Sequence, residues 1–160
     1  MTRGDVALWR IAKHTTAFAA DDLSGGGAKA TGGRWNRKGK AMVYTATTIA
    51  LATLETLAHT GDTLGIRNAF LVKIIVPAAV WKLRERVEVA GLDATWLASP
   101  AGPATLNVGD TWLAACTSPL LLVPSVIVPE ECNVLINPAH PAAARIRASV
   151  VRQYVYDPRL

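Results

Sequence analysis

The chain has 160 residues, 51% of them hydrophobic and 18% charged, a balance that excludes a disordered chain and predicts one domain, residues 1–160, with a buried core. Its 17 Lys and Arg residues outnumber 12 Asp and Glu residues, and the formal net charge of +5 favours an anionic substrate or partner. The basic residues are scattered and lack the interleaved aromatics of a nucleic-acid-binding face, although nonspecific attraction to nucleic acid stays open.

The first predicted element is a strand over Val6–Ala12, in which Arg10 interrupts a run of apolar and aromatic residues. A buried strand rarely tolerates an unpaired guanidinium, so we expect Arg10 either at a sheet edge or against an anion. Residues 14–31 are rich in Ala, Asp, Ser and Gly and show neither helical nor strand periodicity, which predicts a mobile loop. The loop includes a glycine triplet and is either a flap over a site or a plain surface connection.

The next segment opens with a glycine pair that delivers Arg34. Glycine allows the main chain to approach a ligand closely, and the planar guanidinium of Arg34 suits a phosphorylated partner. A brief strand over Ala41–Thr45 brings Tyr44 to a strand end. The alternative is that Arg34 is a loop cation and Tyr44 a half-buried core residue.

A helix follows this strand, with Thr47 or Thr48 as its N-cap and its end at about His59. Glu55 lies at the edge of the apolar stripe of this helix, a position from which a carboxylate can face a cleft. The alternative is a solvated helix carboxylate with no role.

The middle of the chain is predicted as an interior strand followed by shorter elements. Asn68–Val76 is apolar on both faces, which indicates a strand inside a sheet. Asp110 is expected to cap a short helix over Thr111–Cys116. The remaining assignments are a turn region at His59–Arg67, a strand or irregular crossing at Ala79–Val89, and an ambiguous stretch at Leu92–Thr105 whose prolines break any helix.

Near the C-terminus Leu120–Val128 is predicted as a strand with Pro124 at an edge or a bulge. A bulge would re-aim Ser125 towards a cleft, whereas the alternative is an exposed hydroxyl without a role. No G-x-S-x-G motif surrounds this serine, which disfavours a serine hydrolase. Asn133–Ile136 continues the sheet and Ala148–Tyr156 forms the last strand, so the sequence predicts an α+β domain, mostly sheet with a few short helices.

Three separated motifs give the chain a resemblance to the RES domain family, bacterial toxins that consume NAD. The matching residues are Arg34 within GGRWN, Glu55 within ALATLE and Ser125 within LLLVPSVIVP, followed by CNVLINPAHP and a closing DPRL. The resemblance implies an ADP-ribosyltransferase-like fold, in which a mixed, mostly antiparallel split β-sheet with short helices holds NAD in a cleft. No G-x-G-x-x-G follows a strand, so NAD would be a substrate, and neither a cofactor nor a metal is expected.

The resemblance also implies a role for each matching side chain. Glu55 would offset the positive charge that builds on the ribose when nicotinamide leaves, and Arg34 would hold the pyrophosphate. Tyr44 would stack on nicotinamide, and Ser125 would hydrogen-bond the ribose or the amide. Supporting contacts to NAD are expected from Arg10 and Asn133.

The expected activity is degradation of NAD at the nicotinamide–ribose bond, as a glycohydrolase or phosphorylase that transfers ADP-ribose to water or phosphate. The alternative is an ADP-ribosyltransferase that modifies a protein, and a non-enzymatic basic module that binds nucleic acid or protein is the competing class. Family members are neutralised by a helix-turn-helix antitoxin of the Xre type, which would make contact with DNA indirect. A homo-oligomer stays open.

Three further features bear on partners and location. Arg37, Lys38 and Lys40 follow GGRWN where the family often has small or turn-forming residues, so they either contact phosphate or an acidic antitoxin tail, or are solvated. Cys116 and Cys132 are too few for a disulfide scaffold and too far apart for a zinc motif, so buried thiols are expected. No secretory or membrane-spanning pattern is evident, which predicts a cytoplasmic protein.

Overall fold

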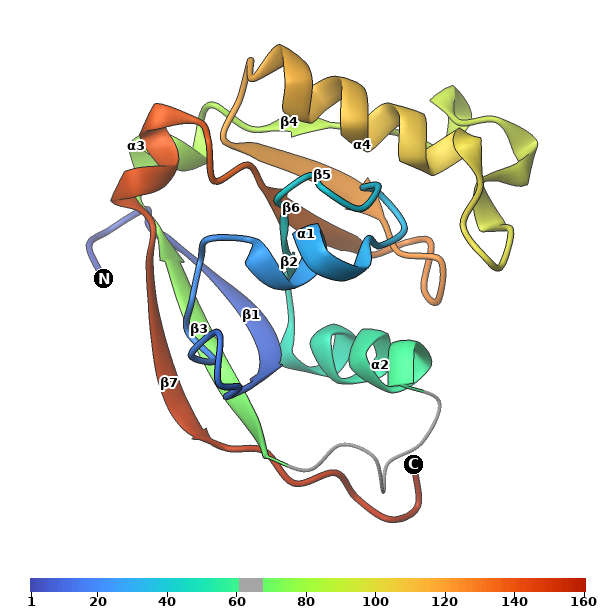
Figure 1. The fold of residues 1–160 in the computed structure, drawn as a ribbon. Coiled ribbons are helices and arrows are strands. Elements are labelled where there is room, and N and C mark those ends of the chain that lie inside the picture. The colour runs from blue at the N-terminus through green and yellow to red at the C-terminus, as the bar shows by residue number, and fades with distance from the viewer. Residues whose placement is uncertain (61–67) are drawn as a thin grey trace.

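The computed structural model describes residues 1–60 and 68–160, and within these ranges seven strands form one sheet (Figure 1). The strand order is β4-β5-β6-β2-β1-β3-β7, with β4 parallel to β5 and the other neighbours antiparallel. The strands are β1 (Val6–Lys13), β2 (Val43–Ala46), β3 (Ala69–Val76), β4 (Glu85–Arg86), β5 (Leu120–Pro124), β6 (Cys132–Ile136) and β7 (Arg147–Gln153). The predicted α+β class with a mostly antiparallel sheet is confirmed.

The sheet divides into two halves between β1 and β2. These strands pair through Trp9 and Ala46, whereas β1 pairs with β3 along its whole length. One half therefore contains β4, β5, β6 and β2, and the other contains β1, β3 and β7. In Figure 1 the β1–β3–β7 half diverges from β2 on the left of the view. The narrow junction gives the split sheet that the resemblance predicts.

Helices connect and cover the strands. The α-helices are α1 (Gly26–Thr31), α2 (Ile49–Thr60), α3 (Ala78–Trp81) and α4 (Pro103–Ala115), and the 3-10 helices are η1 (Val89–Gly91), η2 (Ala94–Leu97) and η3 (Pro141–Arg145). Helix α2 follows β2 directly, and the Thr48 hydroxyl accepts a hydrogen bond from the Leu51 amide, as the capping prediction requires. No helix in the described ranges is long and apolar enough to cross a membrane.

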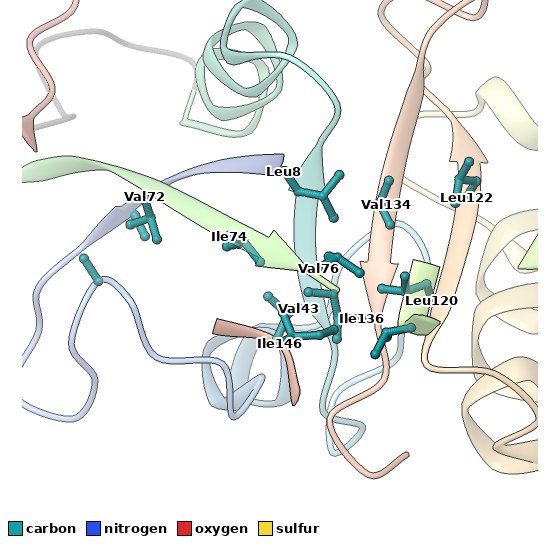
Figure 2. Close-up of a cluster of buried hydrophobic side chains, with 13 residues drawn as sticks. Leu8, Val43, Val72, Ile74, Val76, Leu120, Leu122, Val134, Ile136 and Ile146 are labelled. Carbon is teal, nitrogen blue, oxygen red and sulfur yellow. The ribbon is translucent and has the colours of Figure 1, made fainter. Parts of the chain in front are cut away.

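The two faces of the sheet are packed differently. On one face a continuous cluster includes Leu8, Val72 and Ile74, each fully buried (Figure 2). We call this side the closed face. On the opposite side α2 packs through Leu51 and Ala52, and a separate cluster around Trp112 lies under α4. Helix α2 is thus held on the sheet where β1 and β2 meet.

Several local predictions are wrong for identifiable reasons. Residues 14–31 are not all loop, because the glycine triplet leads into α1. Asp110 does not cap a helix: α4 starts earlier, at Pro103, where proline suits the first helical position. The predicted strand or crossing at Ala79–Val89 resolves into α3 and the short β4, and the stretch at Leu92–Thr105 contains η2 and the start of α4.

The C-terminal strands are shorter than predicted. β5 ends at Pro124, which pairs with Cys132 in unbroken register, so the bulge alternative is wrong for this strand pair. On the other side β4 pairs with Leu121 and Leu122, short of Pro124, which agrees with the alternative of an edge position. β7 ends at Gln153. Both cysteines are half-buried instead of buried. Most of the turn predicted at His59–Arg67 lies outside the described residues.

Candidate functional site

The carboxylate of Glu55 lies at the centre of a small polar cluster. Its Oε1 accepts hydrogen bonds from Ser125 Oγ at 2.7 Å and from Asn133 Nδ2 at 2.5 Å. The three residues come from α2, from the residue after β5 and from β6. The structure therefore brings together three of the side chains that the sequence singled out.

Ser125 is 0% exposed, and its hydroxyl uses all of its hydrogen-bonding positions within the protein. It donates to Glu55 and accepts from the Ile127 amide at 3.0 Å and the Val128 amide at 3.1 Å. A hydroxyl has one proton and two acceptor positions, so each is used. Ser125 has no exposed surface, so its contact with the exterior of the protein is through Glu55.

The second carboxylate oxygen of Glu55, Oε2, has a different environment from Oε1. Within residues 1–60 and 68–160, Oε2 accepts no hydrogen bond and the carboxylate forms no ion pair. Glu55 is half-buried, at the boundary between the α2 packing face and solvent. A negative charge with one oxygen fixed and one open is suited to contacting a ligand hydroxyl or a developing cation.

Tyr44 lies beside this cluster on the same face of the sheet. Ala46, two residues on, pairs with Asn133, so Tyr44 and Asn133 project to one side. The Tyr44 hydroxyl donates to Asn36 Oδ1 at 2.7 Å and accepts from the Trp35 amide at 2.9 Å. Burial raises the pKa of Tyr44 well above its ordinary value, and the hydrogen bonds with Trp35 and Asn36 only partly oppose the rise. The hydroxyl stays protonated, and the half-buried ring packs against the cluster around Trp112.

The turn that carries Arg34 is fixed to Tyr44. A Cβ on Gly33 would lie 2.6 Å from the Tyr44 hydroxyl, so only glycine fits there. Asn36 is fully buried, and its Nδ2 donates to the carbonyls of Ala28 and Lys40, each at 2.9 Å. The close approach expected of the glycine pair is therefore made within the protein, to Tyr44.

Arg34 connects this turn to η2. Its Nη1 donates to the carbonyls of Trp96 at 3.0 Å and Ala98 at 2.9 Å. Nε and Nη2 make no hydrogen bond in the described part of the chain, and the side chain is half-buried. One nitrogen thus orients the guanidinium, and two remain for an anion.

Helix α4 holds the turn from its other side through Gly109 and Asp110. Arg37 donates from its amide to Asp110 Oδ1 at 3.1 Å and forms a 2.7 Å ion pair with Oδ2. A Cβ on Gly109 would lie 1.7 Å from the Trp35 carbonyl oxygen, so α4 meets the turn directly. Arg37 is therefore a structural cation.

Arg10 lies apart from the Glu55 cluster. Leu8, Arg10 and Ala12 follow one another at two-residue spacing along β1, so Arg10 projects to the closed face, as Leu8 and Ala12 do. β1 is an interior strand, and Nη1 of Arg10 donates to the Asp22 carbonyl at 2.9 Å. Burial lowers the pKa of Arg10, and the nearby Asp22 carboxylate opposes this. Of the two predicted settings for Arg10, the sheet edge is wrong and the Asp22 carboxylate is the nearby anion. The bond to the Asp22 carbonyl fixes the loop before α1.

A surface groove elsewhere is unrelated to this cluster. It has a volume of about 480 Å³ and lies between β4 and α4, with Arg86, Val108 and Trp112 among its lining residues. Glu55, Tyr44 and Arg34 do not line it.

Comparisons with known proteins identify close relatives. The RES domain family matches residues 7–157. A "Prs ADP-ribosylating toxin" from Sphingobium sp. is 49% identical over 154 residues, covering 96% of each chain. A protein named "Toxin Res" from Yersinia enterocolitica is 36% identical, covering 96% of this chain and 98% of its own.

The fold also has a solved counterpart. A chain in the crystal structure of the M. tuberculosis MbcT–MbcA toxin–antitoxin complex matches with a TM-score of 0.68 at 15% identity. The match covers 92% of this chain and 85% of that one. At this identity the likeness concerns the fold.

Proposed function

The chain belongs to the RES domain family, and from this premise we propose that it is a toxin that breaks NAD at the bond between nicotinamide and ribose. The observation that carries the proposal is the Glu55 carboxylate, held on Oε1 by Ser125 and Asn133 with Oε2 open. NAD is the substrate in this proposal, and the chemistry uses neither a metal nor a cofactor.

Glu55 supplies the electrostatic part of the reaction. As the bond to nicotinamide lengthens, positive charge grows on the ribose and the pyridinium nitrogen becomes neutral. A fixed carboxylate beside the sugar stabilises this transition state more than the ground state, which raises the rate. Ser125 and Asn133 hold the carboxylate in place before the reaction, so little reorganisation is needed.

Arg34 and Tyr44 supply binding. The open Nε and Nη2 of Arg34 suit two oxygens of a pyrophosphate, while the bonds to Trp96 and Ala98 keep the guanidinium in position. The Tyr44 ring offers an apolar surface for nicotinamide. Arg10 is outside this constellation, because it projects to the closed face.

The acceptor of ADP-ribose is proposed to be a protein. The supporting observation is the Sphingobium relative, 49% identical over almost the whole chain, whose name states that it ADP-ribosylates Prs. Transfer to water or to phosphate, which the sequence favoured, is the second candidate. Prs is accordingly the first acceptor to test.

A cognate antitoxin is the proposed protein partner. The relatives named "Toxin Res" and the fold shared with a chain of a toxin–antitoxin complex support such a pairing. We propose a helix-turn-helix antitoxin of the Xre type, with both proteins in the cytoplasm and DNA contacted through the antitoxin.

Purified protein with NAD tests the proposal. Mass spectrometry of the products, with and without phosphate and with and without Prs, separates the acceptors. Release of nicotinamide supports cleavage, and the mass of the ADP-ribosyl product identifies the acceptor. If no nicotinamide appears under any condition while nucleic acid binds tightly with a steep salt dependence, the basic binding module is correct instead.

A further inference from the structure

The β1–β3–β7 half of the sheet has one uncovered side, which we call the open face. It consists of two rows of paired residues across the three strands: Trp9, Lys73 and Ser149, and Ala7, Ile75 and Arg147. Both rows lie on the opposite side from Leu8 and Ile74, because side chains alternate along a strand. In Figure 1 β7 forms the outer margin of this half.

Burial distinguishes the open face sharply from the closed one. Val72 and Ile74 on β3 are fully buried, whereas the residues between and beside them, Lys73 and Ile75, are half-buried. The cluster formed by helix α2 and the C-terminal segment covers this side at Ile11 and Leu71, and Trp9 of the first row packs against its margin. Ala7 and Ile75 of the second row belong to none of the hydrophobic clusters in the described ranges, so the helix that carries Glu55 borders the open face.

The open face is cationic and contains a large aromatic ring. The Lys73 ammonium lies 5.8 Å from the centre of the Trp9 ring, and none of the six residues is acidic. Lys73 makes no ion pair in the part of the chain that the structure describes. Arg147 is exposed. Tryptophan and arginine beside aliphatic side chains are typical of protein interfaces, and unpaired cations attract an acidic partner.

Pairing across the sheet connects this face to the candidate site. Trp9 pairs with Ala46, and Ala46 pairs with Asn133, whose amide holds Glu55. Trp9 is therefore two strands from Asn133, a separation of about 10 Å at ordinary strand spacing. A protein resting on the open face would bring its surface side chains within reach of a ribose held at Glu55.

We propose that the open face is where the protein acceptor of ADP-ribose docks, through an acidic and partly apolar surface. The inference rests on the proposed function. In the transfer, the electron pair of the glycosidic bond leaves with nicotinamide, a nucleophilic side chain of the acceptor bonds to the ribose carbon, and its proton passes to water. Water and phosphate need no such surface, and two copies of this chain would oppose their own cations.

Charge reversal tests the proposal without disturbing the core. The variants are Lys73→Glu and Arg147→Glu, and Lys82→Glu is the matched control because Lys82 is exposed on the loop after α3. Each is incubated with labelled NAD and either purified Prs or a bacterial extract, and labelled protein is quantified. In parallel, NAD binding and acceptor-independent NAD cleavage are measured.

We expect each open-face variant to lower protein labelling about tenfold or more by raising KM for the acceptor, and added salt to weaken labelling by wild type more than by the variants. Lys82→Glu should label acceptor protein as well as wild type does, and NAD cleavage should not change in any variant.

The proposal would be overturned if Lys73→Glu and Arg147→Glu labelled acceptor protein as well as Lys82→Glu does, or if they lost NAD binding. Unchanged labelling with lost antitoxin binding would also overturn it, and would assign the face to the antitoxin. If the wild-type protein cleaves NAD but labels no protein, the docking proposal alone is wrong. If it neither cleaves NAD nor labels protein, the proposed function is wrong as well.

Discussion

The buried hydroxyl of Ser125 donates to Oε1 of Glu55 at 2.7 Å, across a separation of 70 residues in the chain. This bond fixes a carboxylate on α2 to the strand end after β5, and two amides of the following turn fix the hydroxyl in return. Ser125 is therefore a positioning residue in the proposed reaction. Its removal should alter the rate more than the binding of NAD.

Ser125→Ala is expected to lower kcat about tenfold with little change in the KM for NAD, because the carboxylate loses a donor that orients it. Leaving the part-buried amides of Ile127 and Val128 without their acceptor should also cost about 1 kcal/mol of the free energy of unfolding. Steady-state kinetics and urea unfolding measure the two effects.

Ser118→Ala is the control for this variant. Ser118 is almost fully buried and its hydroxyl bonds both the Trp112 indole and the Leu120 carbonyl, away from Glu55. A similar loss of stability with normal kcat is expected there. Equal kcat losses in the two variants would mean that Ser125 is merely structural.

Arg34→Lys should reduce kcat/KM about tenfold or more, although the charge is kept, because one ammonium cannot bond two carbonyls and also present two parallel donors to a pyrophosphate. The KM for NAD should rise, which kinetics over a range of NAD concentrations would detect. Lys38→Ala removes an exposed cation of the neighbouring sequence and should have little effect. Full activity of Arg34→Lys would reduce Arg34 to a general electrostatic role.

The sequence allowed the chemistry of the site to be predicted better than its contacts. Glu55 at the edge of an apolar stripe and Asn133 on a strand could be singled out by residue type and position. That Ser125 and Asn133 both bond one oxygen of Glu55 depends on how β5, β6 and α2 pack, which local patterns do not encode. The strands were found because their apolar runs are long, and the split followed from the family resemblance.

Asp110 illustrates what local patterns cannot predict. Aspartate is a good N-cap, so a helix starting after it was the reasonable prediction. The structure places it inside α4, where its carboxylate bonds Arg37 from a distant turn. Tertiary contact overrides the capping preference here. The same contact makes Arg37 structural, although three clustered cations suggested an anion site or a solvated surface.

Tyr44→Phe should show how strongly its environment holds the phenolic proton. The variant should lose about 1–3 kcal/mol of stability near pH 7, since the buried Trp35 amide and Asn36 oxygen lose their partner. Burial raises the pKa of Tyr44 in the folded protein, so the stability it contributes is fully present below the unfolded pKa and is lost as pH rises. Urea unfolding from neutral to strongly alkaline pH should show wild type and variant converging above about pH 10, where an unfolded tyrosine ionises. Other groups titrate in both proteins and cancel. A constant difference would contradict the raised pKa.

Glu55→Gln bears most directly on the proposed mechanism. The amide keeps the shape of the carboxylate, and its oxygen can still accept from Ser125 and Asn133, so we expect the fold and most of the NAD affinity to survive. The negative charge is lost, and with it the stabilisation of positive charge on the ribose. This should cost about 3 kcal/mol in the transition state, roughly a hundredfold in turnover. Nicotinamide release and NAD binding are measured on the folded variant, with thermal unfolding as the structural control. Near-normal turnover would remove Glu55 from the reaction, whereas turnover lost together with the fold would make it a structural residue.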